Sequence, residues 1–500
     1  MASISLYFVA FLILYVFTKH FLHKIQNLPP CPFPCFPIIG HLYLLKRPLF
    51  RTLTKIAHRN GPLVFLQMGN RPVVVVSSPS TAEECLTKND IIFANRPRLM
   101  IAEHIGNNCK SLAWSPYGDH WRNLRRITSI EILSTSRLQM LSNIRADEVR
   151  LLIRKLSDRQ DKPVELKTVL FELTLNVMTR MIVGKPFYGE NVADVEEAKK
   201  FRAAQDELIK IFSASNYGDF LPWLKSKKLE RRMIECQRNR EQFIRDLLEQ
   251  SRRKLNKDGG GERKKTMIEM LLSQQESEPE YYTDEMIGQL MLLLLSAGTE
   301  TSITTMEWAF SLLLSHPEVI KKAQKEIENV VGLDRLINES DLAKLPYLRG
   351  VISETMRMYP AVPLLLPHES TAECTVAGFR IPAGTLLFIN VWAIQNDPKV
   401  WEDPKIFKPE RFEGVEGTAR DGFKLMPFGS GRRACPGDGL ALRVVGLTLG
   451  SLIQCFEWER VGEEMVDMTE GLTAIAMPKA QPLQAKCRPR AAMIKVLSQI

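Results

Sequence analysis

One cysteine of this chain lies in a loop that is rich in glycine and arginine. Residues 428–437 read FGSGRRACPG, with Cys435 close to the end of the segment. A sulfur ligand that stays deprotonated beneath a flat macrocycle needs backbone N–H donors nearby and room for the main chain to approach. Gly431 and Gly437 are expected to supply that room, because neither has a side chain. The loop therefore predicts a thiolate ligand to a haem iron.

The other residues of the loop fit this role. Pro436 suits the first position of a following helix, which would place Cys435 at a helix N-terminus where aligned peptide dipoles favour an anion. Arg433 is expected to bind a haem propionate with its guanidinium. Phe428 is expected to pack beside the sulfur and restrict water. An ordinary half-buried cysteine in a glycine-rich turn is the alternative, and it suits an isolated Cys-Pro-Gly better than ten patterned positions.

Three further segments occur together with the cysteine loop. They are SAGTETS at 296–302, ETMR at 354–357 and PERF at 409–412. With the loop, they resemble the cytochrome P450 superfamily over nearly the whole chain. The resemblance implies a mainly α fold with small β-sheets, and haem b held between a long central helix and the loop. It also implies Cys435 as the axial ligand and an oxygen-dependent monooxygenase activity.

The first of these segments lies inside an apolar run that predicts one buried helix of about thirty residues. Gly298 interrupts this run, and a glycine there costs about 1 kcal/mol relative to alanine. In the family the helix opens here over the iron, so Ala297 and Gly298 would form an oxygen groove. Thr301 would donate a hydrogen bond there, and Glu300, where the family more often has Asp, would relay protons from solvent. A glycine packing site beside a helix break is the alternative.

The second and third segments supply charged residues. Glu354 and Arg357 are three apart, so they share one face of a helix that ends before Pro360. By resemblance they form a buried ionic triad with Arg411. Removing one member of such a triad would strand a buried charge. An exposed Glu-Arg pair is the common alternative for this spacing.

Two other segments resemble the propionate contacts of the family. Trp121 and Arg125 are four apart on a predicted helix, and the resemblance assigns both to the haem carboxylates. His368 matches the family's basic residue at the edge of the same pocket. A surface cation-π pair is the alternative for a tryptophan near arginines.

The N-terminus predicts a membrane anchor. Residues 2–18 have no charged side chain, a length at the short limit for crossing a bilayer, and Lys19 and Lys24 follow. A cleaved signal peptide would have its positive charges first. Residues 1–24 are therefore expected to be a single-pass anchor in the endoplasmic reticulum, with the catalytic domain in the cytoplasm. A buried core helix is the alternative.

Residues 25–45 follow the anchor and contain five prolines between positions 29 and 37. This composition predicts a stiff, extended hinge. The remaining residues, 46–500, show no repeat and are expected to form one catalytic domain. Nine cysteines without paired spacing argue against a disulfide framework and for a reducing compartment. Strands are expected at 63–68, 72–77 and 384–390.

The net charge of +10 predicts acidic partners. Lys424, Arg432 and the arginines at 122 and 126 are expected on the thiolate side of the haem, as a dock for an electron donor. The resemblance implies that NADPH-cytochrome P450 reductase is this donor, with cytochrome b5 as a second one. Part of the charge would favour membrane lipid. The glycine-rich basic segment 251–266 is expected to be a solvated loop and not a nucleic-acid site, because it has no interleaved aromatic residues.

The resemblance also bears on the substrate. Residues 334–370 and 424–461 look like a plant clade of isoflavone hydroxylases, xanthone-forming enzymes and lignan methylenedioxy-bridge synthases. This implies aromatic hydroxylation of a small hydrophobic phenolic in plant secondary metabolism, with electrons from NADPH. The pocket would be lined by mostly apolar segments at 101–113, 211–223, 292–297, 361–366 and 471–474.

Three alternatives to phenolic hydroxylation remain at this point. The first is oxidation of a di- or triterpenoid. The second is a haem-thiolate isomerase or dehydratase that needs no reductase, and the third is a non-catalytic haem carrier. The sequence IQNDP at 394–398 differs from relatives, which often have a His-Arg pair before the Asp, and the sequence offers no account of this difference.

Overall fold

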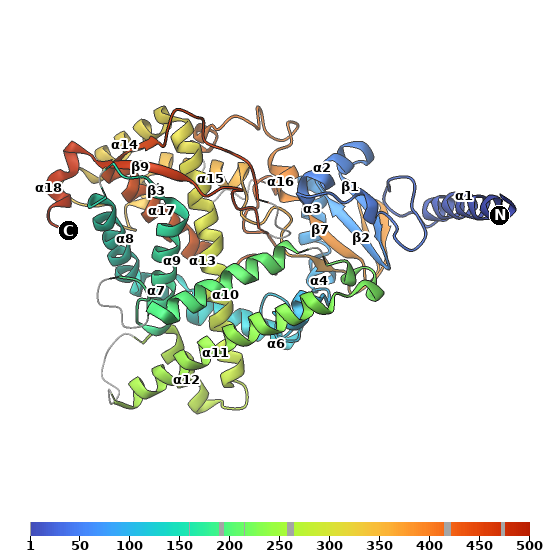
Figure 1. Cartoon of the computed structure of the whole chain (residues 1–500), viewed down its shortest axis with the longest axis horizontal. Helices are drawn as coiled ribbons and strands as arrows, with labels where there is room; N and C mark the ends of the chain where they lie inside the picture. The colour runs from blue at the N-terminus through green and yellow to red at the C-terminus, as the bar shows by residue number, and fades with distance from the viewer. Residues whose placement is uncertain are drawn as a thin grey trace.

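The described residues form a mainly helical fold with three small sheets, which confirms the predicted class. The computed structural model describes residues 2–159, 161–189, 195–214, 216–257, 265–414, 422–471 and 476–500. Figure 1 shows helix α1 projecting from one end of the molecule, with strands β1, β2 and β7 next to it and the larger helical part beyond them.

The helices of the first half of the chain include the long pair α10 and α11, which pack against each other. A π-helical segment, Ile127–Ile132, continues α6. The α-helices of this half are α1 (Ala2–Ile25), α2 (Leu49–Asn60), α3 (Pro79–Leu86), α4 (Asp90–Phe93), α5 (Met100–His104), α6 (Asp119–Arg126), α7 (Thr135–Met140), α8 (Ser142–Ser157), α9 (Leu166–Val183), α10 (Val195–Ser213) and α11 (Lys227–Lys257).

The helices of the second half contain the longest one, α13. They are α12 (Met267–Ser277), α13 (Asp284–Ser315), α14 (Pro317–Val331), α15 (Pro346–Met358), α16 (Val391–Gln395), α17 (Asp438–Cys455) and α18 (Ile494–Leu497). Short 3-10 turns connect the elements at Leu42–Leu44, Tyr217–Asp219, Pro222–Leu224, Leu342–Lys344, Pro409–Phe412 and Ala491–Met493.

The largest sheet has the strand order β1-β2-β7-β4. β1 (Leu63–Met68) and β2 (Arg71–Val76) are antiparallel, β7 (Leu386–Ile389) is parallel to β2, and β4 (His368–Glu369) is antiparallel to β7. The second sheet joins β3 (Val164–Glu165), β9 (Gln484–Pro489) and β8 (Phe456–Arg460), and the third joins β5 (Cys374–Val376) and β6 (Phe379–Ile381). The strands expected at 63–68, 72–77 and 384–390 are thus confirmed within a residue or two.

Helix α13 runs through the middle of the helical part and packs most extensively on α9. Its start is fixed by Thr283, whose side chain accepts a hydrogen bond from the N–H of Met286 at 3.2 Å. Its end is fixed by Pro317, which begins α14. Most side chains of α13 are buried, so this helix forms the centre of the main hydrophobic core.

Helix α13 has no break at Gly298, so the opening expected there is absent. A Cβ added at Gly298 would lie 2.9 Å from both Cε and Sδ of Met178 on α9. The glycine therefore allows close packing of the two helices. This is the packing role that the sequence offered as the alternative, although without the helix break that went with it.

Two other expectations about local structure need correction. The segment 25–45 is not simply extended, because Phe36 and Gly40 exchange two backbone hydrogen bonds and form a turn. This segment also binds the edge of β1, where the N–H of Phe65 donates to the carbonyl of Pro30 at 2.9 Å. In the basic segment 251–266, α11 continues to Lys257, so its first part is helix and not loop. Residues 258–264 lie outside the described part.

Candidate active site

A cavity of about 340 Å³ lies between α13 and the cysteine loop. Most of its wall comes from α6, α9, α13, α15, the turn after α15, the loop 427–437 and the beginning of α17. The expected site residues that line it are Trp121, Arg125, Ala297, Gly298, Thr301, His368, Phe428, Arg433, Cys435 and Gly437. These residues come from four distant parts of the sequence and meet at one cavity.

The cysteine loop is held by its own backbone and by one ion pair. The N–H of Cys435 donates to the carbonyl of Phe428 at 2.9 Å, which closes the loop into a turn. Gly431 has φ +69°, and a Cβ there would lie 2.6 Å from Oδ1 of Asp90. Arg432 pairs with the same carboxylate at 2.6 Å. A glycine is therefore needed at 431 because the backbone of the loop lies against the side chain of Asp90 on α4.

Cys435 lies before the helix and not in it. The capping residue of α17 is Gly437 and the first helical residue is Asp438, so Pro436 does not occupy the first helical position. The sulfur nevertheless accepts a hydrogen bond from the N–H of Gly437 at 3.4 Å. Burial raises the pKa of the Cys435 thiol, while this N–H and the Arg125 guanidinium oppose the rise. A cation bound to the sulfur would favour the thiolate.

Three guanidinium groups line the cavity without a carboxylate partner among the described residues. Arg433 donates to the carbonyls of Ala94 and Ser115, each at 2.6 Å. Arg125 donates to the carbonyl of Ala434. The third, Arg96, was not expected from the sequence.

Arg96 is buried and bonds only to main-chain oxygens, including that of Pro367 at 2.7 Å. Burial lowers the pKa of Arg96 to about 9. Burial, Arg96 and Arg125 together lower that of Arg433 to about 8. Arg96 is buried, Arg125 and Arg433 are half-buried, and the first two lower the pKa of the third, so the three positive groups form a site for a dianion. The Asn-Arg-Pro sequence around Arg96 carries no helical or loop pattern that could have indicated this.

His368 and Trp121 complete this polar end of the cavity. Burial lowers the pKa of His368 well below its usual range, with a further contribution from Arg96. Its Nδ1 lies 2.7 Å from the carbonyl of Phe93, so the neutral ring donates there. The indole N–H of Trp121 donates to the carbonyl of Leu112 at 3.2 Å, and Arg433 stacks over its ring at 4.3 Å. His368 therefore lies at the edge of the cavity as expected and contacts the carbonyl of Phe93, while its contact with a propionate stays a prediction.

On α13, Thr301 and Glu300 point to different surroundings. Thr301 lines the cavity, and its hydroxyl donates to the carbonyl of Ala297 at 2.7 Å. Glu300 is not among the cavity-lining residues. Burial raises the pKa of the Glu300 carboxyl, and Lys167 at the start of α9 opposes this rise. The structure therefore brings Thr301 to the cavity but not Glu300, so a proton from Glu300 would need an intermediate carrier.

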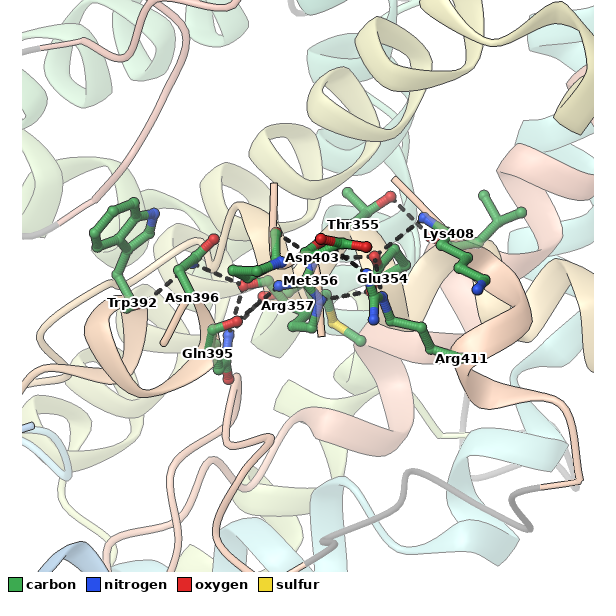
Figure 2. A network of polar contacts seen from close by, with 12 residues as sticks. Glu354, Thr355, Met356, Arg357, Trp392, Gln395, Asn396, Asp403, Lys408 and Arg411 are labelled. Carbon is green, nitrogen blue, oxygen red and sulfur yellow. Dashed lines mark hydrogen bonds and ion pairs between the residues drawn. The ribbon is translucent and has the colours of Figure 1, made fainter. Parts of the chain in front are cut away.

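Glu354, Arg357 and Arg411 meet in one network of polar contacts, as Figure 2 shows. The carboxylate of Glu354 accepts from Arg357 at 2.6 and 2.9 Å and from Arg411 at 3.2 Å. Glu354 and Arg357 are fully buried. The triad holds two positive groups and one negative group, and main-chain carbonyls receive the excess N–H donors of both arginines.

The apolar part of the cavity wall only partly follows the segments expected from the sequence. Leu112, Ala113, Leu293, Leu294, Ala361, Val362, Leu365 and Leu366 come from three of them. Residues 211–223 contribute no lining residue in the described part, and residues 472–474 lie outside it. Thr174, Val177 and Met178 of α9 were missed. Since α9 is apolar on nearly every side, its sequence does not show which face borders a cavity.

A sequence model of the family described as Cytochrome P450 matches residues 29–484 of the chain. The chain belongs to the cytochrome P450 family. This confirms the resemblance and the monooxygenase class. It also means that the cofactor is a haem-thiolate iron and that electrons come from a redox partner.

Individual cytochromes P450 resemble the chain along most of its length. Cytochrome P450 81Q32 of Catharanthus roseus is 51% identical, covering 95% of this chain and 94% of that protein. The isoflavone 3'-hydroxylase of Medicago truncatula is 49% identical, covering 93% of each. The (+)-piperitol/(+)-sesamin synthase of Sesamum radiatum is 47% identical, covering 95% and 93%. A zebrafish cytochrome P450 structure with progesterone is 25% identical with a TM-score of 0.77, covering 89% of this chain and 100% of that one.

The residues at the cavity fit the haem of this family. A porphyrin with two propionates is a dianion at its edge, and the three guanidiniums without carboxylate partners supply the matching charge. Cys435, the one cysteine of the wall among the described residues, would supply a sulfur ligand. The chemistry of the donor set therefore agrees with the family, and this agreement is independent of sequence similarity.

Proposed function

We propose that the protein is an NADPH- and O2-dependent monooxygenase that hydroxylates a plant phenolic on an aromatic ring. The observation that carries this proposal is that Thr301 and Cys435 line one cavity whose remaining wall is mostly apolar. An apolar cavity with few polar groups binds a small hydrophobic substrate and excludes water from it.

Each site residue has a distinct role in this proposal. Cys435 ligates the iron, and Phe428 and Gly437 enclose its sulfur. Arg96, Arg125 and Arg433 bind the propionates, with His368 and Trp121 beside them. When bound, the haem supplies the oxygen chemistry of the family. Thr301 holds a proton at its Oγ1 on the cavity wall beside Ala297 and Gly298, and Glu300 takes up protons from the solvent side.

Electrons are proposed to come from NADPH through a membrane-bound reductase, with cytochrome b5 as a second donor. Arg122, Arg126 and Arg432 are half-exposed and form part of the docking surface together with Lys424. All three arginines have acidic neighbours, Asp119, Glu131 and Asp90, so their field is weaker than the sequence indicates. Helix α1 anchors the chain in the endoplasmic reticulum, residues 25–45 form the hinge, and residues 46–500 form the cytoplasmic catalytic domain.

The phenolic substrate class is supported by the relatives, which include a hydroxylase named for isoflavones. The relative named as a sesamin synthase supports a second candidate reaction, oxidative bridge formation on a lignan. Thr301, which some bridge-forming enzymes lack, favours hydroxylation. Terpenoid oxidation is a less favoured reading.

The test is to express the full chain in microsomes with a plant reductase and to screen phenolic, lignan and terpenoid compounds. A hydroxylated phenolic that forms only with NADPH is the expected product. Turnover of a hydroperoxide without NADPH would instead indicate an isomerase or dehydratase. A reduced, CO-treated sample without the red-shifted Soret band of thiolate ligation would contradict the assignment of Cys435.

A further inference from the structure

Gln395, the last residue of α16, has an unusually complete set of buried hydrogen bonds. Its side chain is fully buried. The amide nitrogen donates to the carbonyls of Met356 and Arg357 at 2.9 and 3.1 Å. The amide oxygen accepts the backbone N–H of Met426 at 2.8 Å. Both amide hydrogens and the carbonyl oxygen are therefore used, without solvent.

The two carbonyls that Gln395 binds belong to the last turn of α15. Carbonyls in the last turn of a helix have no partner within the helix, so Gln395 satisfies two groups that burial would otherwise leave without hydrogen bonds. The backbone oxygen of Gln395 in turn accepts from the Arg357 guanidinium at 2.7 Å. Figure 2 shows Gln395 beside Arg357 on the opposite side from Glu354 and Arg411.

The N–H that donates to the Gln395 amide oxygen belongs to Met426, directly before the cysteine loop. Met426 is buried and directly precedes Pro427 and Phe428, which line the cavity. The carbonyl of Phe428 accepts the N–H of Cys435. A continuous path of hydrogen bonds and short chain segments therefore runs from the ionic triad through Gln395 to the turn that carries the cysteine.

We infer that Gln395 is a positioning residue that fixes the cysteine loop relative to α15, so that the sulfur of Cys435 is held in place for the iron. The ionic triad acts through Gln395, because Arg357 donates a hydrogen bond to the backbone carbonyl of Gln395. The side-chain oxygen of Gln395 in turn accepts the N–H of Met426. This inference rests on the proposed role of Cys435. It gives a physical account of the buried glutamine in the IQNDP segment.

Three variants test this role. Gln395→Met keeps the shape of the side chain but removes all three of its hydrogen bonds. Gln395→His keeps one donor and one acceptor on opposite sides of a ring, so it can preserve the contact to Met426. Gln454→Met is the matched control, because Gln454 is also fully buried and also bonds two backbone groups, the N–H of Ile337 and the carbonyl of Arg335, each at 3.0 Å.

Gln454 lies in the last turn of α17, and Cys435 precedes the first turn of that helix. Loss of its hydrogen bonds is therefore expected to lower the melting temperature without moving the cysteine loop. The two methionine variants are compared under conditions in which both have lost the same amount of melting temperature. A difference between them then reports the position of the cysteine loop and not the overall stability of the protein.

The first measurement is hydrogen exchange at the amide of Met426 in haem-free protein. Exchange of this amide should be about tenfold or more faster in Gln395→Met than in the parent, because the N–H of Met426 loses its acceptor. The exchange rate should be unchanged in Gln454→Met. An unchanged rate in Gln395→Met would overturn the inference. This measurement does not depend on haem, so it tests the contact even if the role of Cys435 is wrong.

The second measurement is the Soret band of the reduced, CO-treated holoprotein. Gln395→Met should lose the thiolate-type band several times faster than Gln454→Met, and Gln395→His should lie close to the parent. Equal rates of loss in the two methionine variants would show that Gln395 acts only on stability and would overturn its positioning role. Absence of the band from the parent would instead contradict the proposed function itself.

Discussion

The hydroxyl of Thr301 has an acceptor within its own helix, the carbonyl of Ala297. A threonine hydroxyl that donates to this carbonyl still has lone pairs directed to the cavity, so it can accept and pass on a proton there. A hydroxyl used in this way contributes to coupling between electron use and product formation. It contributes little to the binding of an apolar substrate.

We therefore expect Thr301→Ala to lower the ratio of product formed to NADPH consumed by roughly tenfold, which is less than the roughly 100-fold or larger rate effect of a general acid-base residue. The missing product should appear as released peroxide, while substrate affinity changes little. Thr301→Ser keeps the hydroxyl and is the control. The ratio is measured in microsomes with excess reductase, and an unchanged ratio in Thr301→Ala would mean that Thr301 carries no proton.

Glu300 gives a pH-dependent prediction. Burial raises its pKa above the ordinary value of 4.5, so above that value the native state retains a proton that the unfolded chain releases. The free energy of unfolding must then fall as pH rises from 4.5 through the raised pKa. Lys167 reduces this effect, whereas Asp206 and Glu307 increase it.

Glu300→Gln removes this titration and should make the protein more stable than the parent at about pH 7.5, with the difference shrinking toward pH 4.5. Urea unfolding of detergent-solubilised protein at several pH values measures it. The exposed Glu402 offers a control, since Glu402→Gln should leave the pH profile of stability nearly unchanged. A difference at Glu300 that grows toward low pH would contradict the assigned direction.

At the scale of elements, local signals in the sequence predicted what depends on local chemistry. The length of α13, the three sheet strands and the pairing of Glu354 with Arg357 followed from apolar runs and residue spacing. The packing partner of Gly298 did not follow, because it is Met178, in a helix more than a hundred residues earlier. Arg96 was missed for the same reason, since its place at the cavity is set by contacts with Leu366 and Pro367.

The charge balance of the ionic triad leads to an ordered prediction. Glu354→Gln leaves two guanidiniums without a carboxylate, so it should lower the free energy of unfolding by about 3–5 kcal/mol. Arg411→Met leaves a neutral Glu354–Arg357 pair and should lower the free energy of unfolding by less. The Arg411 side chain is 10% exposed and makes one hydrogen bond to Glu354, at 3.2 Å. Urea denaturation of the three proteins measures this order.

An exposed ion pair serves as the reference for the triad. Arg380 and Glu373 lie 2.7 Å apart with side chains 42% and 56% exposed. Arg380→Met should therefore change the free energy of unfolding by at most about 1 kcal/mol. If Arg411→Met proved as damaging as Glu354→Gln, the result would contradict the stranded charge as the cause of the expected order.

At the scale of the whole molecule, α1 differs from the other long apolar helices. Three helices are long and apolar enough to cross a membrane within the described part of the chain, α1, α13 and α17. The apolar windows of α13 and α17 are 56% and 72% buried inside the protein, whereas that of α1 is 6% buried. Burial inside a core explains α13 and α17, so α1 alone has an apolar surface without a protein partner.

Deleting residues 2–25 should therefore release the protein from the membrane without unfolding the catalytic domain. The 24 residues of α1 span about 36 Å as a helix, enough for the hydrocarbon core. Few contacts tie the helix to the domain, such as the ring of His23 against Phe65 at 5.1 Å. The expected result is a truncated protein that high salt washes from microsomes, that still binds haem with a thiolate-type CO spectrum, and that receives electrons poorly from membrane-bound reductase.

Full-length protein treated in parallel is the control. Truncated protein that resists the salt wash would show that a further surface of the catalytic domain enters the bilayer, because a salt wash removes electrostatic attachment but not buried apolar area.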